Sequence, residues 1–215
     1  MAISITPLSG GNTPADGSDP RTFPAIWNAT ASDLESEILP NGVSSPSDGE
    51  LLAYDSGTSE WVNQALESAQ LPAGSVLQVV RATDTADRTT SSSSFTDTGL
   101  SVTITPTSAS SLIYVMSSCL LFTQDASSTG TQAFLQITDS SDVALDGAEE
   151  SALFLAVGGA SAVTLRAQQG LIGFDSPGST SAQTYKLRFK QGSSTTTTIE
   201  NASNTGQLIA IEVAA

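Results

Sequence analysis

Few residues in this chain are suited to catalysis. The sequence contains no histidine, which excludes Ser-His-Asp and Cys-His nucleophilic arrangements and histidine-ligated zinc. No G-x-S-x-G, P-loop or G-x-G-x-x-G motif occurs in a suitable context; the glycine pair at 158 and 159 lacks the spacing. The sequence therefore predicts no catalytic residue, no cofactor and no enzymatic activity.

One acidic stretch, "DSSDVALDGAEE", resembles a metal site in composition. Tested as a calcium-binding loop that starts at Asp142, it places Ala144 at an oxygen-ligand position and Leu153 at the bidentate glutamate position. We therefore favour a solvated acidic hairpin loop and predict no metal site, with weak calcium binding as the open alternative. The stretch carries five carboxylates: Asp139, Asp142, Asp146, Glu149 and Glu150.

The remaining chemically distinctive side chains have structural interpretations. Cys119, the single cysteine, lies in an apolar run, which predicts a small buried core residue and excludes a disulfide framework. Lys186, Arg188 and Lys190 alternate along one predicted strand, as an edge-strand guard or a row of salt bridges would. Both tryptophans, Trp27 and Trp61, lie in the N-terminal third, which disfavours a carbohydrate-stacking platform on the rest of the chain.

Charge and hydropathy limit the partners. The 22 acidic and 7 basic residues give a formal charge of -15, which repels nucleic acid. No run approaches 18 consecutive apolar residues, and the N-terminus lacks the pattern of a secretory signal. We expect a soluble protein with no nucleic-acid or membrane partner, made in a host cytoplasm without a secretion signal.

The positioning elements are β-strands. From residue 75 to 215 the chain shows nine short runs, rich in β-branched residues and separated by Gly, Ser, Asp and Pro turns. This pattern predicts an all-β, antiparallel sandwich or jelly-roll-like domain. The run 111–122 is apolar at nearly every position, which predicts a strand covered on both faces, by a second sheet or, as we favour, by a neighbouring subunit.

Residues 1–47 read as an extended arm. They contain six prolines, and one short helix is predicted in "SDLESEILP", capped by Ser32 and stopped by Pro40. A helix of this length is marginal in water, so its apolar residues require a surface to dock on. That surface is either another protein or the chain's own β domain. The predicted docking residues of the arm are Phe23, Ile26, Trp27, Leu34 and Ile38.

Between arm and domain, residues 48–74 form a predicted hairpin and linker. In "DGELLAYDSGTSEWVNQ" one strand runs from Glu50 to Tyr54, and after a turn the return strand "WVN" brings Trp61 opposite Tyr54. A lone two-stranded hairpin is marginally stable, so contact with a sheet or with copies of itself is expected. Tyr54 and Trp61 therefore complete the set of predicted docking and assembly residues.

This hairpin resembles one found in fibre and appendage proteins of tailed bacteriophages, where Gly-x-Leu-x-Tyr-Asp, a polar turn and Trp-x-Asn recur. The matching residues are Gly49, Leu51 or Leu52, Tyr54, Asp55, Trp61 and Asn63. The segment "GLSVTITPTSASSLIYVMSS" is similar to strand pairs in trimeric virion surface proteins of marine and cyanobacterial phages. The resemblance implies a homotrimeric, non-enzymatic β protein on the virion surface.

Two virion roles fit this resemblance. A capsid decoration protein, of the cement or head-fibre type, would use its arm to grip the major capsid protein or another virion protein. A tail-fibre receptor-binding protein would recognise a host surface glycan. The chain has no heptad run or glycine repeat for a fibre shaft, and an extended 47-residue arm reaches on the order of 150 Å. The sequence therefore favours decoration, with the tail fibre as the alternative.

Overall fold

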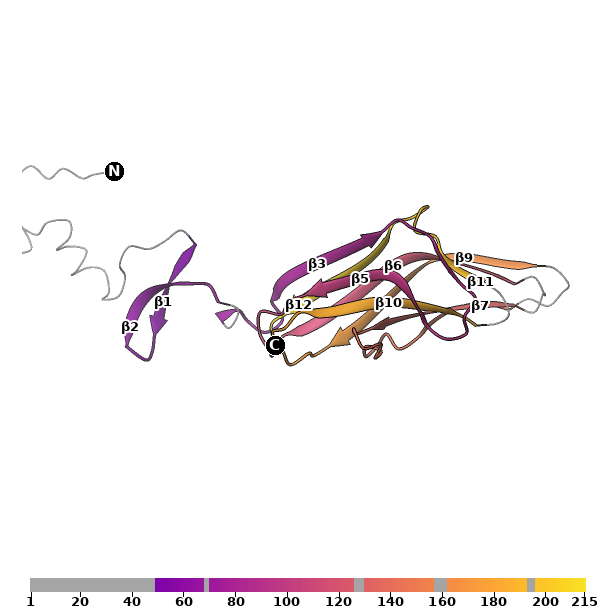
Figure 1. The fold of residues 1–215 in the computed structure, drawn as a ribbon. Helices are drawn as coiled ribbons and strands as arrows, with labels where there is room; N and C mark the ends of the chain where they lie inside the picture. Colours follow the sequence, from indigo (N-terminus) through magenta and orange to yellow (C-terminus); the bar gives the residue numbers. More distant parts are fainter. Residues whose placement is uncertain (1–48, 68–69, 126–129, 157–161, 193–195) are drawn as a thin grey trace, which may run out of the picture. The chain divides into compact units, whose positions relative to one another are not determined.

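A computed structural model of the chain describes residues 49–67, 70–125, 130–156, 162–192 and 196–215. Strands dominate these residues, which confirms the predicted all-β class (Figure 1). They fall into two compact units, divided after Leu66. The predicted arm and its short helix lie outside the described residues. None of the described residues belongs to a helix that could cross a lipid bilayer.

The first unit contains the predicted hairpin, formed by β1 (Glu50–Asp55) and β2 (Glu60–Ala65). In the described part of the second unit, each of the nine predicted runs forms a strand, and β4, three polar residues without an apolar pattern, was not predicted. The strands are β3 (Val76–Asp84), β4 (Arg88–Thr90), β5 (Thr96–Ile104), β6 (Leu112–Asp125), β7 (Thr131–Thr138), β8 (Ser151–Leu155), β9 (Val163–Asp175), β10 (Gln183–Gln191), β11 (Thr196–Ile199) and β12 (Gly206–Val213).

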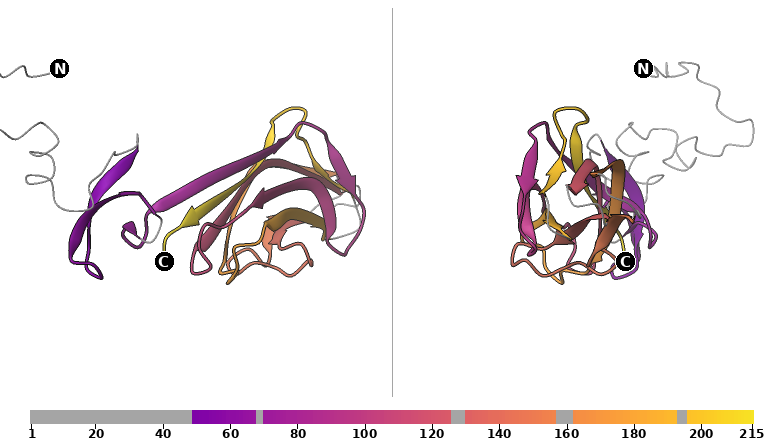
Figure 2. Two further views of the ribbon diagram at one scale, coloured as in Figure 1. Left: turned by 60° about the vertical axis from the view of Figure 1, so that its left-hand side comes forward. Right: turned by 90° about the vertical axis from the view of Figure 1, so that its right-hand side faces the viewer.

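Two antiparallel sheets make up this β domain. One has the strand order β5-β10-β7-β8, and the other has the order β3-β12-β6-β11-β4 with β9 paired to β6. Viewed end-on, the two sheets lie around a common interior (Figure 2). The predicted antiparallel, sandwich-like architecture is confirmed.

Strand β6 organises the larger sheet because it is long enough to pair with several partners. One edge pairs with β9 from Ile113 to Asp125. The other edge pairs first with β12, up to Ser118, and then with β11, from Leu121 to Gln124. The strands β3 and β4 join the sheet through β12 and β11. Register errors in β6 would therefore misplace most of the sheet.

The core lies between the sheets, and it explains the alternation along the strands. Ile113, Val115, Cys119 and Leu121 of β6 are fully buried, and they belong to the same core cluster as residues of β7 and β10 such as Leu135 and Phe189. The outward residues of β6 alternate with them and are half-buried or exposed. The second sheet thus covers one face of β6, and the favoured cover of the other face by a neighbouring subunit stays a prediction.

Several threonines are buried in the interior of the domain, among them Thr98, Thr123 and Thr131. Thr123 and Thr131 are buried and hydrogen bonded to each other at 2.7 Å. The buried Thr98 hydroxyl donates to the carbonyl of Leu187 at 2.7 Å. Burying a hydroxyl costs little free energy when a protein hydrogen bond replaces the bond to water. The hydroxyls of these threonines make such bonds to residues of other strands.

A buried carboxylate closes one end of the domain. Glu212 points inward from β12 and is fully buried. Its Oε1 accepts hydrogen bonds from the Thr107 amide at 2.7 Å and hydroxyl at 2.8 Å, and its Oε2 accepts from the Gln78 amide. Burial alone would raise the pKa of Glu212, but hydrogen bonds from Ser111, Gln78 and Thr107 outweigh it and hold the pKa below its ordinary value of about 4.5.

The burial of Cys119 predicts an unreactive thiol. Burial raises its pKa to about 12, so about one thiol in ten thousand is ionised at pH 8. We expect no reaction of the native chain with an aromatic disulfide reagent, and one thiol per chain after denaturation in guanidinium. Labelling of the native chain as fast as free glutathione would contradict this placement.

Glu212→Gln should destabilise the β domain by about 1–3 kcal/mol at pH 7, because an amide NH₂ would face the donors of Gln78 and Thr107. Since the folded-state pKa lies below about 4.5, the wild-type contribution is present above that pH and falls as the pH decreases through the folded value.

Urea titrations between pH 7 and pH 3 measure both effects. The variant should lose less stability than the wild type below pH 4.5. The matched control is Glu149→Gln, at an exposed position. Equal stability and equal acid dependence of Glu212→Gln and wild type would contradict the role of Glu212.

Candidate assembly surfaces

The hairpin turn is fixed by local contacts. Strands β1 and β2 pair in register from Glu50 opposite Ala65 to Asp55 opposite Glu60. In the connection, Asp55 Oδ1 accepts the Gly57 amide at 2.8 Å, and Ser59 has a left-handed φ of 60°. An aspartate that bonds the amide two residues on forms a side-chain turn. The polar turn of the sequence motif thus sets the strand register.

This register brings the two aromatic residues of the motif together. Tyr54 and Trp61 are direct partners, with ring centroids 5.5 Å apart and an edge-on interplanar angle of 63°. The predicted contact is confirmed. Such a pair contributes about 0.5–1.5 kcal/mol beyond its buried area, yet Tyr54 stays 54 % and Trp61 44 % exposed.

Leucines extend the exposed apolar surface of the hairpin. Leu51 and Leu52, neighbours on β1 that point to opposite faces, are each about half exposed. A two-stranded hairpin is at best marginally stable in water, so apolar surface on both of its faces favours a partner. That role of Tyr54 and Trp61 stays a prediction. The other predicted docking residues, Phe23, Ile26, Trp27, Leu34 and Ile38, lie outside the described residues.

The outer face of the four-stranded sheet is charged and internally paired. Lys186 and Arg188 of β10 both contact the Asp142 carboxylate, and Lys190 pairs with Glu150 at 2.6 Å. Lys190 also lies over the ring of Phe134, 4.8 Å from its centroid. The salt-bridge interpretation of the basic row is confirmed. The edge-guard interpretation is wrong, because β10 lies between β5 and β7.

The acidic loop supplies these partners and is anchored at its base. It joins β7 to β8, and its Leu145 and Ala148 are buried. Gly173 of β9 permits this close approach, since a Cβ there would lie 2.8 Å from the Ala148 methyl group and 2.9 Å from Leu145 Cβ. The loop is thus a packed connection with charged residues directed outward.

Three of the five loop carboxylates, Asp139, Asp142 and Glu150, have protein partners. Asp139 Oδ1 accepts the amides of Ser141 and Val143 at 2.8 and 2.9 Å. The hydrogen bond from Lys186, with the charge of Arg188, lowers the pKa of Asp142 against a smaller opposing effect of desolvation. Among the residues that the structure describes, no three His, Cys, Asp or Glu side chains are grouped to hold a metal ion.

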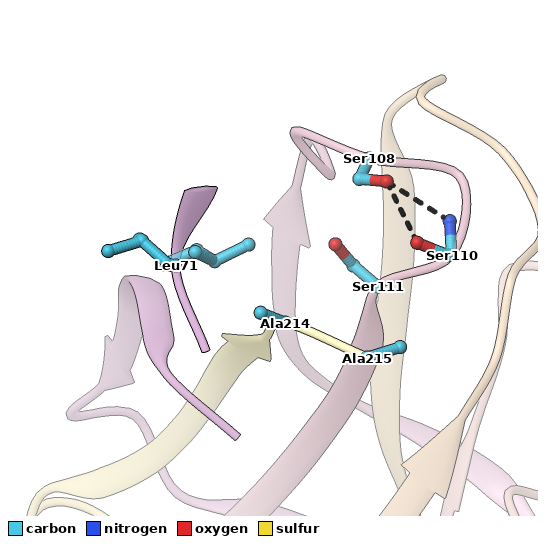
Figure 3. Close-up of a pocket in the computed structure, with 7 residues that line it drawn as sticks. Leu71, Ser108, Ser110, Ser111, Ala214 and Ala215 are labelled. Carbon is cyan, nitrogen blue, oxygen red and sulfur yellow. Dashed lines mark hydrogen bonds between the residues drawn. The ribbon is translucent and has the colours of Figure 1, made fainter. Parts of the chain in front are cut away.

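Two hollows in the β domain differ in their chemistry. The first, of about 250 Å³, is lined by apolar residues and serines and contains no titratable side chain (Figure 3). Ser108 and Ser110, which lie on one side of it, hydrogen bond to each other through their hydroxyls at 3.0 Å.

The second hollow, of about 290 Å³, lies beside the acidic loop and is lined by Asp139, Asp146 and Asp175. Asp175 accepts the Tyr185 hydroxyl at 2.7 Å. Burial, and then this bond to a carboxylate, raise the pKa of Tyr185.

Outward residues of β3, β6, β9 and β12 form a second apolar surface, which we call the apolar sheet face. The sequence alone identified the apolar run of β6, which forms the centre of this face. It did not predict which residues of that run are buried and which point outward. The outward apolar residues are Val76 and Val79 of β3, Leu112, Tyr114, Met116, Leu120 and Phe122 of β6, Ile172 and Phe174 of β9, and Ile209, Ile211 and Val213 of β12.

Comparisons with known proteins give distant matches. No protein-family model and no curated protein matches the chain. A solved structure of the D431N mutant VP2 protein of infectious bursal disease virus, in derived T=1 particles, matches with a TM-score of 0.32 and 12 % identity, over 80 % of this chain and 44 % of the other.

A structure of the Gx strain of the same virus matches with a TM-score of 0.26 and 15 % identity, over 77 % of this chain and 43 % of the other. The chain thus spans less than half the length of both matched chains. Matches at these TM-scores carry no argument about fold or function.

The paired state of the acidic loop predicts the outcome of a calcium titration. Because Asp142 and Glu150 are bound by cations and Asp139 caps its own turn, we expect no saturable heat when calcium is titrated into the chain by calorimetry. A calcium-binding EF-hand protein in the same buffer is the positive control. Stoichiometric binding that is lost in Asp142→Asn would contradict this assignment.

Proposed function

We propose that this chain is a non-enzymatic virion structural protein of a tailed phage, a homotrimeric capsid decoration protein. Residues 1–47 anchor it to coat subunits, and the β domain is displayed outward. The observation that carries the proposal is the hairpin β1–β2, whose Tyr54 and Trp61 pair across the strands and remain about half exposed.

The hairpin supports assembly on physical grounds as well as by resemblance. It is too small to be stable alone, and it presents large apolar side chains on both faces. Copies of the hairpin around an axis, or a coat surface, would remove these side chains from water. Its turn and aromatic pair follow the motif that resembles phage appendage proteins.

A decoration role fits the β domain better than glycan recognition. Sugar-binding sites stack rings on exposed aromatic side chains in a concave site. Phe174 is the one aromatic residue that lines the two hollows described above. On the outer face of the four-stranded sheet, the cations of β10 are already paired with carboxylates.

Deletion of residues 1–47 tests the proposed anchor. We expect the truncated chain to be absent from purified particles, while its β domain keeps the thermal transition of the full chain. Incorporation is measured by quantitative mass spectrometry of particles produced with either form. Normal incorporation of the truncated chain would overturn the anchoring role.

Immunogold labelling of intact particles separates the two virion roles in the same experiment. Gold over the head is expected for a decoration protein. Gold confined to the tail would favour the alternative, a tail-fibre protein that binds a host surface glycan, and absence from particles would contradict both.

A further inference from the structure

The two outer faces of the β domain present opposite kinds of surface. On the four-stranded sheet, Lys186, Arg188 and Lys190 are each paired with a carboxylate, as is common on a face that meets water. The apolar sheet face on the other side presents aliphatic and aromatic residues. The four-stranded sheet thus presents a row of paired charges, whereas the apolar sheet face presents mainly apolar side chains.

The apolar sheet face is continuous across four strands. Tyr114 at its centre lies opposite Phe174 of β9 and Ile211 of β12, and Ile211 lies opposite Val79 of β3. The Tyr114 and Phe174 rings are 5.8 Å apart. The next row joins Met116 to Ile172 and Ile209 in the same way. Side chains directly opposite in a sheet touch, so these rows form one patch.

The patch is large for a free surface. Its five most exposed side chains are between 37 % and 59 % accessible: Val76, Val79, Tyr114, Met116 and Ile172. A contiguous exposed apolar patch that spans several strands marks an interaction site on a soluble protein.

Charge on this face is the reverse of that of the whole chain. The outward positions of β3, β6, β9 and β12 carry no carboxylate, although the chain has 22 acidic residues. They carry Arg81 and Arg166. Arg166 pairs with Glu200 at 2.6 Å, whereas Arg81 donates to the neutral Gln207 at 3.0 Å. A partner with an acidic surface is electrostatically matched to this face.

We propose that the apolar sheet face packs against a second copy of this chain. A copy with a net charge of -15 supplies carboxylates around a contact that itself carries none. A head-to-tail contact would bring such carboxylates toward Arg81 while apolar residues leave water, and contacts of this kind form a ring when the rotation between copies closes. The inference rests on the homotrimer of the proposed function, and it assigns the contact to this face.

The purified full-length chain tests the inference without particles. In sedimentation velocity at micromolar concentration, the wild type should have a mass above the 21.9 kDa of one chain. Val79→Glu and Ile172→Glu, at positions more than half exposed, should return it to that of one chain, because they place a carboxylate in the contact. The matched control is Val143→Glu, which changes a valine of similar exposure, 62 %, in the acidic loop.

A second measurement uses only the wild type, so its result does not depend on whether the variants fold. Met116, 37 % exposed in the single chain, should be oxidised by peroxide more slowly at high than at low protein concentration. The inference would be overturned if the wild type had the mass of one chain at all concentrations, or if both glutamate variants associated fully. Equal rates of Met116 oxidation at high and low protein concentration would also overturn it. A chain that associates through this face but is missing from particles would contradict the proposed function and leave this inference supported.

Discussion

The structure of the β domain depends on the register of one strand, β6. Its 14 residues pair with β9 along one edge and with β12 and β11 along the other. Because side chains alternate between faces with a period of two, this register decides which residues enter the core. Ile113, Val115, Cys119 and Leu121 point inward, and Tyr114 and Met116 point outward as a direct result.

Several polar groups inside the domain are tolerated because hydrogen-bond partners on other segments of the fold meet them. Glu212 is held by Gln78 and Thr107, which lie more than 100 residues away in sequence. Thr123 and Thr131 share a hydrogen bond in the interior. These contacts permit a core poor in aromatic residues, and they make it sensitive to changes that leave a donor or acceptor unpaired.

The hairpin and the apolar sheet face pose the same physical problem. Both expose large apolar side chains that the contacts described here do not cover, at Tyr54 and Trp61 in one case and at Val79 and Ile172 in the other. Surfaces of this kind are typical of proteins that assemble. The charged face on the other sheet, where cations and carboxylates neutralise each other, is suited to remain in water.

The sequence by itself determined the fold class and the strands. Alternation and turn residues are local signals, so they were sufficient for the nine runs of the β domain and for the Tyr54 and Trp61 pair of the hairpin. The unpredicted strand β4 has three polar residues, and it is a strand because β11 pairs with it.

Tertiary structure alone decided the partners of these elements. It placed β10 inside its sheet, joined Asp142 to Lys186 and Arg188, and buried Glu212 on the same face of β12 as Leu208 and Ala210. It also showed that the apolar run of β6 has one buried and one outward face. A local pattern predicts which residues of a strand alternate between its two faces. The partner of a side chain depends on segments that are far away in sequence and meet only when the sheets form.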